Sequence, residues 1–128
     1  MTSILVVDDS PTIRTTVEWL LSNSGYNVRI AHDGLSALNA LREFDPDLVL
    51  LDIRLPHVDG YQLCKLIRRN PRFAQVPIVM LSGLSSRSHI QCALDAGADD
   101  YVVKPIQDEV LLNTIQQQLS RAAQNPTH

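Results

Sequence analysis

The sequence has few of the features that mark a membrane, secreted or nucleic-acid-binding protein. Its longest apolar runs fall far short of the ~20 residues that cross a bilayer, and the N-terminus has neither the basic segment nor the cleavage site of a signal peptide. Lys and Arg number 11 against 14 Asp and Glu, giving a formal net charge of −3, which offers no electrostatic attraction to nucleic acid or to an anionic membrane. We therefore expect a cytoplasmic protein that binds neither.

Cysteine, histidine and aromatic residues are also too sparse or too scattered to form familiar sites. The two cysteines, Cys64 and Cys92, form no C-x-x-C pair, and the four histidines show no ligand spacing, so zinc and dithiol redox sites are not predicted. A basic cluster at Arg68, Arg69 and Arg72 is accompanied only by Phe73. We interpret it as a solvated face, because single-stranded nucleic-acid sites interleave several aromatic side chains with the basic ones.

What is present fits one globular domain. The chain has 128 residues, of which 45% are hydrophobic and 20% charged, enough apolar material for a core of ordinary size. No repeat or break in composition divides it. We expect one domain over residues 1–123 and a frayed tail over residues 124–128.

Short apolar runs alternate along the chain with segments of helical periodicity. The runs at residues 4–7, 48–51, 78–81 and 101–103 are apolar almost throughout, as in strands buried on both faces, whereas residues 27–31 alternate like an edge strand. The apolar positions of the intervening helical faces are Ile13, Val17, Leu20 and Leu21; Ala37, Leu38, Leu41 and Phe44; Leu63, Leu66 and Ile67; Ile90, Ala93, Leu94 and Gly97; Leu111, Leu112, Ile115 and Leu119.

This alternation predicts an α/β domain of five βα units. Such units form a parallel sheet with helices on both faces, joined by right-handed crossovers. The signals at the ends of the segments agree with it. Ser10 followed by Pro11 is a helix start, Gly25 is a helix stop, and Asp59-Gly60 is a turn that begins a helix.

Polar residues follow four of the predicted strands. Asp8 and Asp9 follow the first, Asp52 the third, Ser82 the fourth and Lys104 the fifth. Ligands of open α/β sheets bind outside the carboxyl ends of the strands, so we expect all five side chains in one pocket. Alone, each residue would be read as a helix cap or a surface residue; their coincidence favours a site.

The residue types in this pocket predict phosphoryl chemistry. Three close carboxylates repel one another, and Mg²⁺, which prefers oxygen ligands and is often completed by a phosphate, would relieve that repulsion. A lysine and a hydroxyl neutralise and hold phosphoryl oxygens. Asp52, which stands between the acidic pair and the Ser82–Lys104 side, is the predicted nucleophile, giving an aspartyl-phosphate.

Four motifs in order resemble the receiver domain of two-component response regulators. They are residues 4–10 (ILVVDDS), 52–60 (DIRLPHVDG), 78–82 (IVMLS) and 97–105 (GADDYVVKP), within a match that runs from about Ser3 to Arg121. The resemblance implies a flavodoxin-like (βα)5 fold with strand order 2-1-3-4-5, the order that flavodoxin and a chemotaxis receiver are known to share.

The resemblance also implies roles for individual residues. Asp8, Asp9, Asp52 and the backbone carbonyl of Arg54 would hold Mg²⁺, for which Mn²⁺ could substitute. Asp52 would accept phosphate from a sensor histidine kinase or a histidine phosphotransfer protein. The remaining implied roles belong to Ser82 and Lys104 (phosphoryl binding), Tyr101 (a switch aromatic that moves with Ser82), Pro105 (a cis peptide after Lys104) and Gly60 (a structural glycine).

The implied function is a phosphorylation-activated signalling switch rather than a turnover enzyme. The sequence shows no output domain after residue 121. Unless the chain is an excised part of a longer regulator, we expect a separate effector protein to bind the face made by the fourth helix, fifth strand and fifth helix. Arg87, Gln91, Asp95 and Gln107 are assigned to that face. This interpretation also allows a homodimer that forms on phosphorylation.

Three alternatives compete with this interpretation. An Mg²⁺-dependent aspartyl phosphatase would need a second acid two residues after Asp52, where this chain has Arg54. An FMN-binding flavodoxin would need a hydroxyl- and glycine-rich loop where Asp8 and Asp9 would repel the phosphate. A receiver that has lost phosphorylation and serves as a docking module is the third.

Two residues depart from the commonest receiver pattern. Arg54 stands where an uncharged residue is more frequent, and Gly83 stands where alanine is frequent. We hypothesise that Gly83 leaves more room at the phosphate for water or small donors.

Overall fold

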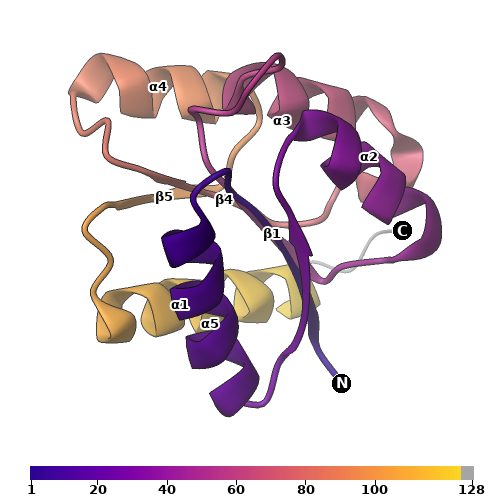
Figure 1. Ribbon diagram of the computed structural model, residues 1–128. Coiled ribbons are helices and arrows are strands. Elements are labelled where there is room, and N and C mark those ends of the chain that lie inside the picture. Colours follow the sequence, from indigo (N-terminus) through magenta and orange to yellow (C-terminus); the bar gives the residue numbers. More distant parts are fainter. Residues whose placement is uncertain (125–128) are drawn as a thin grey trace.

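The computed structural model describes residues 1–124, which form one five-stranded parallel sheet between two layers of helices (Figure 1). The strands are β1 (Ser3–Val7), β2 (Asn27–Ala31), β3 (Leu48–Leu51), β4 (Ile78–Ser82) and β5 (Asp100–Val103). Their order, β2-β1-β3-β4-β5, confirms the predicted topology. The strand register aligns the carboxyl ends, since Val7 pairs with Leu51, Leu51 with Met80 and Ser82 with Val103.

The helices are divided between the two faces of the sheet. They are α1 (Pro11–Asn23), α2 (Gly34–Glu43), α3 (Gly60–Arg69), α4 (Arg87–Asp95) and α5 (Asp108–Gln124), with a short 3-10 turn, η1, at Pro71–Phe73. Buried side chains of α1 and α5 form one core with the sheet, and those of α2, α3 and α4 form the other. Figure 1 shows the two layers on opposite sides of β1 and β4.

Side chains that follow the strands begin the helices. Ser10, Asp33, Asp59 and Ser86 each accept a hydrogen bond from the backbone N–H three residues ahead, which satisfies one of the free donors in the first turn. Asp33 and Asp59 form full capping boxes. These four helices, α1 to α4, therefore begin just beyond the edge of the sheet where the polar residues gather.

The structure corrects the predicted core at its margins. Leu66 and Leu94 have the right spacing but are 40% and 42% exposed, because α3 and α4 each cover the sheet with only part of their apolar stripe. Gly97 lies beyond the end of α4, not on its face, and has φ +111°. The fifth strand, predicted as buried on both faces, is a sheet edge on which Val103 is exposed.

Arg68 is the clearest correction, because it is not a solvated side chain. Its guanidinium donates hydrogen bonds to the carbonyls of Gly97 and Phe73 at 2.9 and 3.0 Å, and to that of Val76. It also pairs with Asp99 at 2.6 Å. Arg68 thus fastens the end of α3 to the segments that precede β4 and β5.

No helix within residues 1–124 is long and apolar enough to cross a membrane. Gln124 is the last residue of α5, and residues 125–128 of the expected tail lie outside the described part of the chain.

Candidate functional site

The carboxyl ends of β1, β3 and β5 bring three acids and one amine together. Asp8, Asp9 and Asp52 each place a carboxylate oxygen within 4.8 Å of the others. The Lys104 Nζ donates to Asp8 Oδ2 at 2.9 Å and to Asp52 Oδ2 at 3.3 Å. Four of the five side chains that the strand-end pattern predicts together therefore form one cluster, although as many as 96 positions separate them in the chain.

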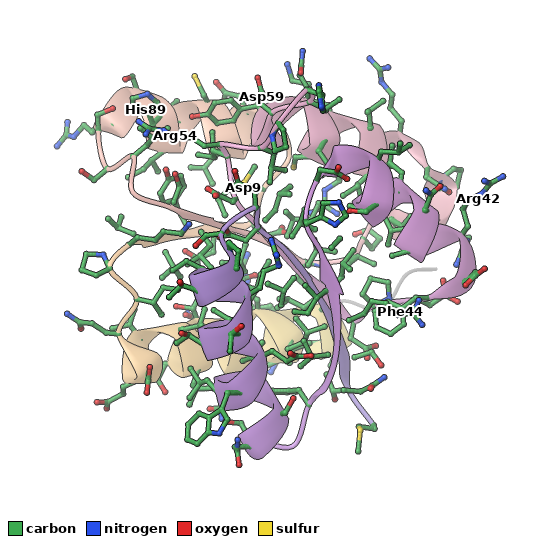
Figure 2. The ribbon with its side chains drawn as sticks, viewed as in Figure 1. Asp9, Arg42, Phe44, Arg54, Asp59 and His89 are labelled. Atoms are coloured by element: carbon green, nitrogen blue, oxygen red, sulfur yellow. The ribbon has the colours of Figure 1, made fainter. Side chains whose placement is uncertain are left out.

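The three carboxylates differ sharply in exposure. Asp8 is fully buried and Asp52 is 5% exposed, whereas Asp9 is exposed. Figure 2 shows Asp9 beyond the end of β1, on the same side of the molecule as Arg54 and Asp59. The site therefore has two buried carboxylates and the half-buried Lys104 at its base, and one exposed carboxylate, that of Asp9, at its open side.

Backbone and side-chain donors fix the two buried acids. The Ser10 N–H donates to Asp8 Oδ1 at 2.9 Å, and Arg14 of α1 donates to the Asp8 carbonyl, also at 2.9 Å. The Arg54 N–H donates to Asp52 Oδ1 at 3.3 Å. Asp8 and Asp52 each keep one carboxylate oxygen facing Lys104, so Lys104 lies at the centre of the arrangement.

Burial and charge set the protonation of this group. Burial, and then the nearby Asp8 charge, raise the pKa of Asp52 above its ordinary value, although Lys104 opposes the shift. Burial works against the charge on Lys104, but its hydrogen bond to Asp8 and the charges of Asp52 and Asp8 prevail and raise its pKa. Lys104 therefore stays cationic, and an excess of negative charge remains for a cation to neutralise.

Gly60 lets α3 begin against the residue that carries the central carboxylate. A Cβ at this position would lie 2.3 Å from the carbonyl oxygen of Asp52 and 2.6 Å from the Cα of Ile53. The Gly60 N–H donates to the Ile53 carbonyl at 2.7 Å. Only glycine permits this approach, so the first turn of α3 rests directly on the backbone of Asp52.

Ser82 and Tyr101 lie on the neighbouring strands β4 and β5. Ser82 is buried, and its Oγ accepts a hydrogen bond from the Leu84 N–H at 3.3 Å. The half-buried Tyr101 donates its hydroxyl hydrogen to the Leu84 carbonyl. Both predicted switch residues therefore contact the same residue, Leu84, of the β4–α4 loop. After β5, the peptide bond between Lys104 and Pro105 is cis.

The donor set fits a hard divalent cation. Asp8, Asp9 and Asp52 offer only carboxylate oxygens, which Mg²⁺ prefers, and the exposed Asp9 leaves room for the waters that Mg²⁺ retains. Within residues 1–124 this is the one cluster of three or more acidic, histidine or cysteine ligands close enough to share an ion.

Comparison with known proteins agrees with this geometry. The response regulator receiver domain family matches residues 4–116. The chain belongs to this family. Its function follows at the family level: it is a receiver domain of two-component response regulators, a signalling switch.

Relatives of the receiver domain include proteins of different length. The chain is 40% identical over 127 residues to the transcriptional regulatory protein AfsQ1 of Streptomyces coelicolor, covering 99% of this chain and 55% of that protein. It is 39% identical over 112 residues to protein PilG of Pseudomonas aeruginosa, covering 88% and 83%. The receiver domain thus spans about half the length of several curated relatives it matches.

Solved structures share the receiver fold closely. Chemotaxis protein CheY4 of Vibrio cholerae superposes with a TM-score of 0.88 at 34% identity, covering 91% of this chain and 98% of that one. The receiver domain of sensor histidine kinase PA1611 from Pseudomonas aeruginosa, described with a magnesium ion in its active-site cleft, has a TM-score of 0.86 at 32% identity, covering 93% and 98%.

Two residues at the receiver site gave no signal in the sequence. Arg14 contacts the Asp8 carbonyl, and Tyr61 of α3 reaches the backbone of α4. An arginine or a tyrosine on a helix is usually a surface or core residue, and only the folded chain shows what these two contact.

Proposed function

We propose that this receiver domain accepts a phosphoryl group on Asp52 from a sensor histidine kinase or a histidine phosphotransfer protein. The observation that carries the proposal is the position of the Lys104 Nζ, which hydrogen-bonds Asp8 and Asp52 together at one edge of the sheet. A carboxylate beside a fixed cation and two further acids is equipped to receive a phosphoryl group and balance its charge.

In the proposed reaction an oxygen of the Asp52 carboxylate attacks phosphorus. The bond from phosphorus to the donor imidazole nitrogen breaks, and that nitrogen keeps the electron pair, so no other reactant is consumed. Lys104 and the Ser82 hydroxyl would hold phosphoryl oxygens. Arg14 and the Ser10 N–H keep Asp8 in place.

The residues that would hold Mg²⁺ are Asp8, Asp9, Asp52 and the Arg54 backbone carbonyl, with Mn²⁺ able to replace it. When bound, the ion supplies positive charge that offsets the phosphoryl oxygens and the acidic cluster. The raised pKa of Asp52 is consistent with this assignment: burial, and then the Asp8 charge, disfavour the Asp52 carboxylate even beside Lys104, and a bound cation would stabilise it.

The proposed output is a changed surface on α4, β5 and α5, to which an effector protein binds. Exposed side chains on this face include Gln91, Val103, Gln107 and Val110. The proposed donors act in the cytoplasm, which is where the domain would work. Several relatives are transcriptional regulators roughly twice as long as this chain, and the match covers about half of each. Binding of an effector protein, and any homodimer, are therefore parts of this proposal.

Intact-mass measurement after incubation with Mg²⁺ and acetyl phosphate tests the proposal. We expect one phosphoryl adduct on the native protein, none on Asp52→Ala, and the native result for the matched control Asp95→Asn, whose carboxylate is exposed on α4. An adduct that survives in Asp52→Ala would reassign the acceptor. No adduct on the native protein, with no response to beryllofluoride, would identify a docking module that keeps the fold without the phosphate.

A further inference from the structure

Two tyrosine hydroxyls hold the backbone between Ser82 and α4. Tyr101 of β5 donates to the carbonyl of Leu84, and Tyr61 of α3 donates to the carbonyl of His89 at 3.2 Å. Both acceptors lie shortly after Ser82, the hydroxyl assigned to the phosphoryl group. The first contact belongs to the Ser82–Tyr101 pair already assigned as the switch, whereas the second has no role so far.

Within residues 1–124, the Tyr61 contact is the one hydrogen bond that joins the first turn of α4 to another helix or strand. The helix is nine residues long, and Ala93 is its one buried residue. Ser86 caps it, and the Ser86 Oγ lies 2.6 Å from His89 Nδ1, but both of these groups belong to the segment itself. Figure 2 shows His89 on the α4 ribbon, on the same side of the molecule as Asp59 at the start of α3. A single contact from α3 therefore has a large share in fixing this turn.

Tyr61 is also tied to the phosphoacceptor segment. It directly follows Gly60, whose N–H bonds to the Ile53 carbonyl and whose Cα packs against the backbone of Asp52. Because Gly60 packs directly on the Asp52 backbone, no gap between them can absorb a displacement of Asp52. Such a displacement must move the start of α3, and the Tyr61 side chain with it.

We propose that Tyr61 is a positioning residue that ties the first turn of α4 to the Asp52 segment. Occupation of the site at Asp52 then reaches α4 by two routes: through Ser82, Leu84 and Tyr101, and through Gly60, Tyr61 and His89. This inference rests on the proposed phosphorylation of Asp52 and assigns a second residue to the readout of that event.

The surroundings of the Tyr61 hydroxyl keep it in the donor form. Burial, and then the neighbouring Tyr101 and Cys92, raise the pKa of Tyr61 above its ordinary value of 10.0. The hydroxyl therefore carries its hydrogen throughout the physiological range.

Hydrogen–deuterium exchange of α4, with and without beryllofluoride and Mg²⁺, tests the assignment in Tyr61→Phe, which removes only the hydroxyl. Without beryllofluoride, we expect exchange of the amides of residues 87–92 to be about five-fold faster than in the native protein, the effect of one lost hydrogen bond. With beryllofluoride, we expect the response of residues 87–92 to fall by about half or more, while that of residues 82–84 is retained.

Three further proteins make the result decisive. Tyr26→Phe is the matched control, because Tyr26 is half-buried in the other core and its hydroxyl has no hydrogen-bond partner within residues 1–124; it should behave as native. Tyr101→Phe should diminish the response of residues 82–84 first. Tyr61→Leu should reproduce the Tyr61→Phe pattern on a less stable protein.

Equal exchange of residues 87–92 in native and Tyr61→Phe proteins, with or without beryllofluoride, would overturn the assignment. Uniformly faster exchange over all helices would also overturn it, since that would report lost stability alone. Failure of the proposed phosphorylation is distinguishable from both outcomes, because the native protein would then show no change in exchange with beryllofluoride. The comparison of native and Tyr61→Phe proteins without beryllofluoride would still test whether the Tyr61 hydrogen bond protects residues 87–92.

Discussion

At the scale of single residues, Asp52 combines the burial of a core residue with the charge of a surface one. It is 5% exposed and lies beside the fully buried Asp8. Natural proteins keep such destabilising groups where they perform a function. The stability of the unphosphorylated, metal-free domain should therefore improve when the charge is removed.

Asp52→Asn should raise the midpoint of thermal unfolding at neutral pH in the presence of EDTA, by an amount of order 1 kcal/mol in stability. Burial and Asp8 raise the folded pKa of Asp52 above 3.8, so the folded protein binds this proton more tightly than the unfolded chain does. Stability contributed by the native carboxyl is accordingly present below pH 3.8 and is lost as the pH rises through the folded pKa. The advantage of Asn should be greatest at neutral pH and vanish in acid, as calorimetry at several pH values would measure. A pH-independent advantage would contradict this account, and Asp95→Asn should show none.

Two glycines near the site make a matched pair. Gly60→Ala places a methyl group against the Asp52 backbone, whereas a Cβ at Gly83 meets nothing within 4 Å. We expect Gly60→Ala to lose about 1–3 kcal/mol of unfolding free energy and to take up phosphate more slowly. Gly83→Ala should leave stability unchanged and lengthen the life of the phosphorylated state, if the space at Gly83 admits water. Urea unfolding and adduct decay measure the two effects, and equal decay rates for native protein and Gly83→Ala would remove the hypothesis about water.

At the scale of elements, the capping box of α3 should contribute measurably to the fold. Asp59 Oδ1 accepts from the Gln62 N–H at 2.9 Å, and Gln62 Oε1 accepts from the Asp59 N–H at 3.3 Å. Asp59→Ala should cost about 1 kcal/mol, whereas Asp59→Asn, which retains the acceptor oxygen, should cost little. Denaturant titration compares the two variants, and an equal loss in both would show that charge rather than capping is what matters.

The elements were largely predictable because their signals are local. Ser10-Pro11 and Asp59-Gly60 begin helices by chemistry that needs no tertiary contact. The same periodicity that placed Leu63 and Ile67 in the core also placed Leu66 there, and Leu66 is exposed. The spacing of apolar residues defines which side of a helix is apolar. How much of that side the sheet covers depends on the tilt of the helix and on how far it extends over the sheet.

At the scale of the whole molecule, the site should couple metal binding to stability. A ligand that binds only the folded chain at about 100 times its Kd stabilises it by about 2.7 kcal/mol. We expect Mg²⁺ to raise the unfolding midpoint of the native domain, EDTA to reverse the rise, and Asp9→Asn to abolish most of it. Asp9 is exposed, so this variant should fold as native does in EDTA. A full Mg²⁺ effect in Asp9→Asn would place the ion elsewhere.

The geometry of a parallel sheet made the main site residues predictable from the sequence, but the prediction was incomplete for residues that bind backbone carbonyls. Parallel strands end at one edge, so Asp8, Asp52 and Lys104 could be brought together from their positions after apolar runs. Arg68 and Tyr61 follow no such rule. Their partners are mainly backbone carbonyls, such as those of Gly97, Phe73 and His89, and every residue has a carbonyl, so no residue type in the sequence marks them.

The assembly of the pocket from distant strands has a consequence during synthesis of the chain. Asp8 and Asp52 leave the ribosome well before Lys104, which is 96 residues beyond Asp8, and the fifth strand can add to the sheet only after that. A nascent chain that has not yet added the fifth strand therefore exposes Asp52 without the lysine that pairs with it in the folded domain. Under the function proposed above, we expect competence to accept a phosphoryl group to arise only when the whole domain has been synthesised, and a chain truncated before Lys104 to remain inactive.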